Sequence, residues 1–155
     1  MEYTIKLLEL NNQPTLTMRA IYPVEKLPEF FGTAYDSVMA YLQELGVEPA
    51  GMPFGIYYNL DMSALDIEAG FPVARVLPGK GEISASIIPG GKYISTLHIG
   101  SYDSMKPAYD ALTEWSERNC YEPTGIAYEY YLNDPNAGPG IVPETEIRFP
   151  VKSLQ

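Results

Sequence analysis

The chain is poor in the residues that support metal binding and nucleophilic catalysis. It contains one cysteine and one histidine, His98. A single cysteine excludes an internal disulfide, and a metal site needs several convergent ligands, so we expect no metal and no cofactor. The serine and threonine residues lack an obvious base partner, because His98 is the single histidine. No glycine-rich phosphate loop is present either.

Basic residues are also scarce. The 155 residues include 10 Lys and Arg against 20 Asp and Glu, which gives a formal net charge of −10. Phosphate contacts depend on Lys and Arg, so we expect no direct nucleic-acid partner. An acidic surface instead favours cationic ligands or basic protein patches. The sequence indicates no particular protein partner.

Long hydrophobic runs are absent. The longest apolar runs extend over a few residues only, so we expect no membrane-spanning segment. The first residues lack the basic region and apolar stretch of a signal peptide, which predicts a cytoplasmic location. With 46% hydrophobic and 19% charged residues, the composition is that of an ordered globular protein.

The sequence repeats itself. Residues 34–51 align with residues 108–125 at a constant offset of 74, with 6 of 18 positions identical. Residues 71–73 recur at 149–151 with an offset of 78, so the second copy has a loop four residues longer. We therefore expect one domain over residues 1–155, built from two copies at roughly 3–75 and 80–152.

Each copy predicts a helix. Val38, Leu42 and their neighbours recur at helical spacing in the first copy, with Pro28 suited to the first turn and Gly46 to the stop. The second copy has a matching apolar stripe, with Asp103 or Ser104 expected as the cap. The stripe residues are Met105, Ala108, Tyr109, Leu112 and Trp115. These stripes are interpreted as core faces.

Strands are expected around both helices, at residues 3–9, 15–22, 54–58, 66–73, 82–88, 92–98, 126–132 and 144–151. The order in each copy is strand, helix, strand, strand. Residues 3–9 and 82–88 are expected to pair with the strands that directly follow them, across turns at 11–14 and 89–91. The predicted fold class is α+β, with two helices on a mostly antiparallel sheet and pseudo-twofold symmetry between the duplicated modules.

The segment 126–132 carries a glutamate among tyrosines. Because strand side chains alternate between faces, Ala127, Glu129 and Tyr131 share one face. At the offset of 74, Glu129 corresponds to Gly55 and Tyr131 to Tyr57. The glycine in one copy leaves room beside the glutamate of the other, and the aromatic rings form walls. This combination predicts a cavity that contains a charge. The alternative is that Glu129 lies on a wet face of the sheet.

Four segments occur in a specific order: residues 98–102, residues 107–112, residues 126–135 with an Asn-Asp-Pro turn, and residues 145–151. Together they resemble the GyrI-like family, the effector-binding domain found alone and at the end of multidrug-responsive transcription regulators. The resemblance covers nearly the whole chain. The two copies leave no room for a helix-turn-helix, so a stand-alone domain is expected.

The resemblance implies a ligand groove between the two copies. In drug-binding members, a glutamate on the strand before the Asp-Pro turn neutralises a lipophilic cation among aromatic rings. Glu129 matches that position, and Tyr131 matches the next pocket-facing one. Tyr57 follows from the internal repeat, and Tyr22 and Phe149 follow from their strand positions.

Three functions are compatible with these features. The first is a protein that sequesters or senses amphipathic, cationic or aromatic small molecules. The second, from similarity to some stand-alone relatives, is a hydrolase that opens strained cyclopropane rings of genotoxic natural products, with Glu129 as acid or base. The third is a DNA gyrase inhibitor that acts by protein contact. Gyrase inhibition is the least favoured, because the acidic residues are spread along the chain and not concentrated in a block that could mimic DNA.

Overall fold

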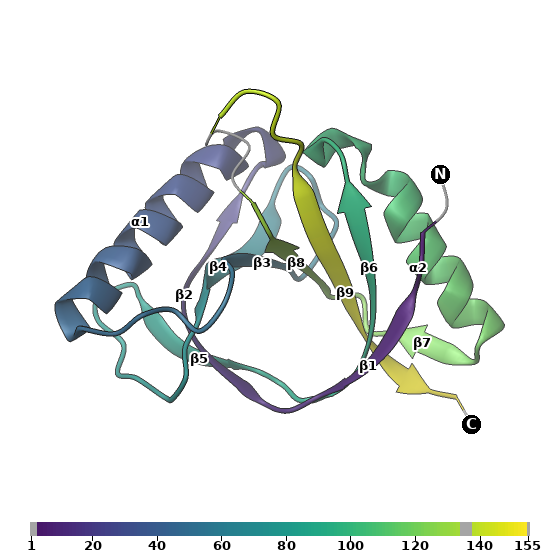
Figure 1. Ribbon diagram of the computed structural model, residues 1–155, viewed down its shortest axis with the longest axis horizontal. Coiled ribbons are helices and arrows are strands. Elements are labelled where there is room, and N and C mark those ends of the chain that lie inside the picture. Colours follow the sequence, from purple (N-terminus) through teal and green to yellow (C-terminus); the bar gives the residue numbers. More distant parts are fainter. Residues whose placement is uncertain (1–2, 134–137, 155) are drawn as a thin grey trace. The chain divides into compact units, whose positions relative to one another are not determined.

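A computed structural model describes residues 3–133 and 138–154. Figure 1 shows its helices and strands, which make it an α+β protein. The chain divides into two compact units. Residues up to Leu10 and residues from Gly91 onward form one unit, which we call the terminal unit. Asn11–Gly90 form the other, the central unit. The Asp134-Pro135 turn expected after the Glu129 strand lies outside the described residues.

The central unit has one helix, α1 (Leu27–Leu45), on an antiparallel sheet ordered β3-β4-β2-β5. The strands are β2 (Gln13–Tyr22), β3 (Phe54–Tyr57), β4 (Leu65–Pro72) and β5 (Ser84–Ile88), and the 3-10 turn η1 (Val24–Lys26) precedes α1. The helix packs on β2 and β4 (Figure 1). Fully buried Ala34, Val38 and Leu42 lie on its inner face, as the helical spacing predicts.

The ends of α1 follow from two residues. Pro28 occupies the first turn, where its missing N–H costs no hydrogen bond. Gly46 caps the carboxyl end in the left-handed conformation, with φ of 69°, which a residue without Cβ adopts at little cost. Both expectations from the sequence are confirmed.

The terminal unit has the second helix, α2 (Lys106–Arg118), on an antiparallel sheet ordered β1-β6-β9-β8. The strands are β1 (Lys6–Leu10), β6 (Gly91–Ile99), β8 (Ala127–Tyr131) and β9 (Glu144–Ser153), and a short strand β7 (Tyr121–Pro123) also pairs with β9. The helix packs on β6, β7 and β9. The sequence did not predict β7, which has only 3 residues.

The expected cap of α2 is wrong. A 3-10 turn, η2 (Tyr102–Ser104), precedes the helix, and Met105 takes the N-cap position without a side-chain hydrogen bond. The polar side chains are used inside the turn instead. The Ser101 hydroxyl donates to Asp103 at 2.6 Å, and the Ser104 hydroxyl donates to the carbonyl of Ser101 at 2.9 Å.

The expected pairing of the two leading hairpins is also wrong. β1 pairs with β6, where Leu7 faces Ile94, and β5 pairs with β2, where Ala85 faces Leu16. The two-residue connections at residues 11–12 and 89–90 therefore join strands of different units and not the two strands of a hairpin. The repeat boundaries and the pseudo-twofold symmetry stay predictions, while the α+β class and the antiparallel pairing are confirmed. In the described part of the chain, neither helix is both long and apolar enough to cross a membrane.

Gly70 provides a test of this packing. It lies on β4 opposite Thr17, and a Cβ at Gly70 would come 2.0 Å from the carbonyl oxygen of Leu16. We expect Gly70→Ala to lower the free energy of unfolding by about 3 kcal/mol, the upper end of the usual cost of overpacking. Urea unfolding followed by circular dichroism measures this change.

The control is Gly32→Ala in the exposed part of α1, where a Cβ would meet nothing within 4 Å. Alanine is the better helix former, so this variant should gain roughly 0.5–1 kcal/mol of stability. Equal stability of Gly70→Ala and the wild type would contradict the close approach of β4 to β2.

Candidate functional site

Glu129 lies at the centre of β8 and is buried, with 7% of its surface exposed. Gly125, with φ of 95°, makes the turn that leads into this strand. Alternation along the strand places Glu129 on one face with Ala127 and Tyr131. The wet-face alternative is therefore wrong, because Glu129 is enclosed by the protein.

Two tyrosine hydroxyls satisfy the Glu129 carboxylate. Tyr109 of α2 donates to Oε2, and Tyr131 of β8 donates to Oε1 at 2.9 Å. A buried carboxylate is costly without such partners. Each carboxylate oxygen thus has a donor, and one of the two donors comes from the helix that covers this face. The pair of hydroxyls holds the carboxylate in a fixed orientation.

Aromatic rings surround this pair. Tyr109 lies 5.4 Å from Phe149 of β9 between ring centroids, and Tyr102 of η2 lies 5.8 Å from Tyr131 in an edge-on arrangement. The terminal unit therefore brings together Glu129, Tyr131 and Phe149, three of the five predicted site residues. It adds Tyr109 and Tyr102, which the sequence analysis missed. Tyr109 was interpreted as part of a core stripe, and its position on the inner face of α2 was the available signal.

The other two predicted site residues, Tyr22 and Tyr57, belong to the central unit. Tyr22 packs 5.3 Å from Phe30 of α1, and both tyrosines pack against the same buried cluster beneath that helix. The cluster includes Leu65, Ile67 and Ala69 of β4. Their participation in the Glu129 site stays a prediction.

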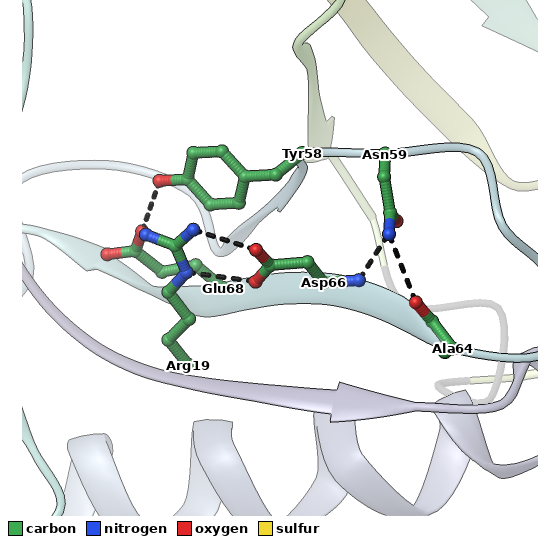
Figure 2. Close-up of polar contacts among 6 residues, drawn as sticks. All are labelled: Arg19, Tyr58, Asn59, Ala64, Asp66 and Glu68. Carbon is green, nitrogen blue, oxygen red and sulfur yellow. Dashed lines mark hydrogen bonds and ion pairs between the residues drawn. The ribbon is translucent and has the colours of Figure 1, made fainter.

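A second buried carboxylate, Glu68 of β4, was not expected from the sequence. It is 4% exposed and accepts hydrogen bonds from the hydroxyls of Tyr58 at 2.5 Å and Thr17 at 2.6 Å. Figure 2 shows the Tyr58 hydroxyl directed at Glu68. Burial raises the pKa of Tyr58 well above its usual value of 10.0, and the hydrogen bond to Glu68 raises it further.

Arg19 extends the Glu68 cluster towards the surface. Its guanidinium forms two hydrogen bonds with Asp66, at 2.9 and 2.8 Å, and lies 3.8 Å from the ring centroid of Tyr58 (Figure 2). Asn59 orients the same strand by accepting from the N–H of Asp66 and donating to the carbonyl of Ala64, both at 3.0 Å. Every charged group in the cluster has a partner, which is typical of a structural network.

The terminal unit has a comparable cluster around Glu146. Ser95 donates to Glu146 at 2.8 Å, as does Arg148 at 2.7 Å, and the Arg148 guanidinium lies 4.4 Å from the ring centroid of Tyr130. The offset of 78 that aligns residues 71–73 with 149–151 also aligns Glu68 with Glu146. That correspondence was the signal that could have found Glu68 from the sequence.

The two polar clusters offer no metal chemistry. Within residues 3–133 and 138–154, no group of 3 or more His, Cys, Asp or Glu side chains is arranged to hold a metal ion. His98 is buried and engaged by other side chains, with the Tyr3 hydroxyl 3.0 Å from its Nδ1. The Glu129 site, with its aromatic walls and one carboxylate, is the arrangement best suited to a small molecule.

Comparisons with known proteins identify the family and the fold. The family model described as "GyrI-like small molecule binding domain" matches residues 1–152. The search of curated proteins gave no match. Among solved structures, the EcmrR C-terminal domain is 24% identical with a TM-score of 0.86, over 99% of each chain.

Two further structures are similar in fold. SAV2435 bound to tetraphenylphosphonium is 15% identical with a TM-score of 0.65, over 99% of this chain and 96% of that one. A hydrolase from Listeria innocua is 13% identical with a TM-score of 0.70, over 96% of this chain and 92% of that one. At these identities the likeness shows the shared fold alone.

Tyr130 gives a pH-dependent test of the Glu146 cluster. Burial raises the pKa of Tyr130 from 10.0 to about 12. Between these values the unfolded chain ionises first, so the raised pKa makes stability fall as the pH rises from about 10 to about 12. Tyr130→Phe should fall less steeply in that window, as measured by urea unfolding at several pH values.

The comparison carries its own control. Between pH 7 and pH 9 the difference in stability between the wild type and Tyr130→Phe should stay constant, because both folded and unfolded tyrosine are then neutral. Parallel stability curves from about pH 10 to pH 12 would contradict the burial of this hydroxyl.

Proposed function

The chain belongs to the GyrI-like family of small-molecule-binding domains, and on that premise we propose that it binds amphipathic molecules with a positive charge or an aromatic system. In this proposal Glu129 pairs the charge, and Tyr131 and Phe149 provide the aromatic walls. Tyr57 and Tyr22 are further candidates for the lining. The protein would sequester such compounds or sense them.

The buried carboxylate of Glu129 is the observation that carries this proposal. The carboxylate is removed from water and accepts hydrogen bonds from two neutral hydroxyl groups, those of Tyr109 and Tyr131. A hydrogen bond from a neutral donor compensates part of the desolvation cost, and an incoming cation adds direct Coulomb attraction. The site is therefore expected to select for positive charge.

The aromatic rings support a broad choice of ligand. Their electron-rich faces attract cations within about 6 Å, and their area suits apolar substituents of many shapes. Tyr109 and Phe149 lie together on this face, and Tyr102 packs against Tyr131. A phosphonium or quaternary ammonium ion has no N–H to donate, so its attraction to Glu129 is Coulombic and needs no hydrogen-bond geometry.

SAV2435, which has a similar fold, binds tetraphenylphosphonium, a lipophilic cation of this kind. That complex supports the choice of ligand class for this chain. The groove between the two copies that the resemblance implies stays a prediction, because the proposal here rests on side chains of the terminal unit.

Glu129→Gln tests the proposal directly. The amide keeps the shape of the side chain and removes its charge, so we expect tetraphenylphosphonium to bind at least about tenfold more weakly, which corresponds to about 1.4 kcal/mol. Triphenylphosphine oxide, a neutral aromatic compound, should bind the variant and the wild type equally. Isothermal titration calorimetry with both compounds gives the comparison.

The matched control is Glu117→Gln, an exposed position on α2 with the same change of net charge. It should bind tetraphenylphosphonium like the wild type, which separates the Glu129 site from the general acidic field. Unchanged binding of the cation to Glu129→Gln would contradict the proposal.

Hydrolysis is the second candidate, and the phenol groups beside Glu129 favour it. A carboxylate next to two hydroxyl donors has the parts of an acid–base pair. Water would add across a strained cyclopropane bond. As the water oxygen bonds to one ring carbon, Glu129 would take a proton from that water. A tyrosine hydroxyl would donate a proton to the other carbon of the breaking bond. Glu129 would then return its proton to that tyrosine.

Mass spectrometry after incubation with cyclopropane-containing electrophiles distinguishes the two candidates. If the protein is a hydrolase, the product gains one water, and Glu129→Gln binds the compound but does not convert it. If it is a binding protein, every compound is recovered intact. We expect intact compounds, because the structure supports a cation site most directly.

A further inference from the structure

Thr145 of β9 has a buried hydroxyl that the fold does not use. The residue is 0% exposed, and across residues 3–133 and 138–154 no hydrogen-bond partner lies within reach of its Oγ1. Burying a hydroxyl without a partner is costly, and such groups in folded proteins call for an explanation. The neighbouring polar side chains of β9 and β6, by contrast, have partners.

Thr145 lies on the same face of the sheet as Glu129. It stands opposite Tyr131 of β8, and Glu129 is two residues before Tyr131. The next pair along, Leu132 and Glu144, is hydrogen-bonded through the backbone at 3.0 Å. Tyr131 and Thr145 therefore form a non-hydrogen-bonded pair, the kind whose side chains lie closest. Thr145 and Glu129 are diagonal neighbours, at a spacing of roughly 7 Å.

His98, on the other side of Thr145, does not satisfy its hydroxyl. It stands opposite Thr145 on β6, but both of its ring nitrogens are engaged. The Tyr3 hydroxyl lies 3.0 Å from Nδ1, and the Ser101 carbonyl and the Ser104 hydroxyl lie 3.1 and 3.2 Å from Nε2. These contacts hold the ring in the β6–η2 corner, away from Oγ1 of Thr145.

The remaining neighbours of Thr145 do not provide a partner. The Tyr131 hydroxyl donates to Glu129 at 2.9 Å. Along β9, the residues two positions away on the same face are Pro143 and Ile147, whose side chains carry no polar atom. The unused hydroxyl therefore lies at the edge of the Glu129 site, separated from the carboxylate by one cross-strand step.

Building on the proposed function, we propose that Thr145 is a specificity-determining residue of the Glu129 site. Its hydroxyl would form a hydrogen bond with a polar group of the ligand, about 7 Å from the positive charge that Glu129 pairs. The preferred ligands are then amphipathic cations that also carry a hydroxyl, ether or carbonyl oxygen at that distance. A cation without such a group leaves Thr145 without a partner.

Tyr131 links access to both groups. It donates to Glu129 and stands opposite Thr145, so we assign to its side chain the movement that gives a ligand access to both groups. In the present state Glu129 is 7% exposed and Thr145 is 0% exposed. A ligand in this site would be recognised at two points, by charge at one end and by a hydrogen bond at the other.

A matched pair of probes tests this proposal. Tetraphenylphosphonium has no hydrogen-bonding group, and [4-(hydroxymethyl)phenyl]triphenylphosphonium carries a hydroxyl about 7 Å from phosphorus, the diagonal spacing on this face. We expect the wild type to bind the hydroxymethyl compound about three- to tenfold more tightly, the usual value of one hydrogen bond. Thr145→Val should bind both compounds equally, and Thr145→Ser should keep the preference.

The outcomes separate this proposal from the proposed function. If tetraphenylphosphonium binds but the wild type shows no preference, or if Thr145→Val keeps the preference, the specificity role is wrong and the binding function stands. If neither compound binds the wild type, both are wrong. An internal water that alone satisfied Thr145 would also leave the wild type without a preference between the two compounds, and the specificity role would then be wrong.

Thermal unfolding provides the structural readout. Because valine replaces an unpaired hydroxyl with a methyl group of similar shape, Thr145→Val should unfold at the same temperature as the wild type or a higher one. A clearly lower unfolding temperature would mean that the hydroxyl has a structural partner, which overturns the proposal. Thr145→Ala removes the hydroxyl with a smaller side chain and should also bind both compounds equally. A packing defect that is specific to valine therefore does not decide the result.

Discussion

The burial of the Glu129 carboxylate beneath two tyrosine hydroxyls is the interaction on which this account depends. The bond from Tyr109 ties α2 to β8, and the bond from Tyr131 fixes the carboxylate along its own strand. A buried carboxylate is stabilised as long as its partners stay in place, because burial removes the water that would otherwise solvate its charge. In the proposed function, a positively charged ligand adds direct Coulomb attraction to these two hydrogen bonds.

The polar clusters around the buried Glu68 and the half-buried Glu146 show what a structural network looks like. Glu68 and Glu146 each accept from a hydroxyl on the neighbouring strand, and each cluster includes an arginine that stacks on a tyrosine. Fully satisfied networks of this kind specify strand register and leave little for a ligand to do. Thr145 differs, because its hydroxyl is buried and unpaired among the described residues. The unpaired Thr145 hydroxyl is the feature that distinguishes the candidate site from these two clusters.

Much of the fold could be predicted from the sequence because its local signals agree. Pro28 and Gly46 bracket α1 as expected, and the alternation in β8 correctly placed Glu129 with Tyr131. Turn chemistry did not reveal that β1 pairs with β6, since a two-residue connection can reverse the chain or carry it onward. The role of Tyr109 was missed because helical spacing reports which face is buried and not where a hydroxyl points. Glu68 was missed because one partner, Thr17, is 51 residues away in the sequence and the other, Tyr58, lies beyond the turn between β3 and β4.

The most direct test of the central claim is a crystal structure of the protein with tetraphenylphosphonium. The account predicts that the phosphonium lies with its charge within about 6 Å of the Glu129 carboxylate and with its phenyl groups against aromatic rings, which include Phe149. It also predicts that the Tyr131 side chain changes position relative to the unliganded state. A cation bound away from Glu129, with both tyrosine hydroxyls unmoved on the carboxylate, would contradict the account and leave Glu129 as a structural residue.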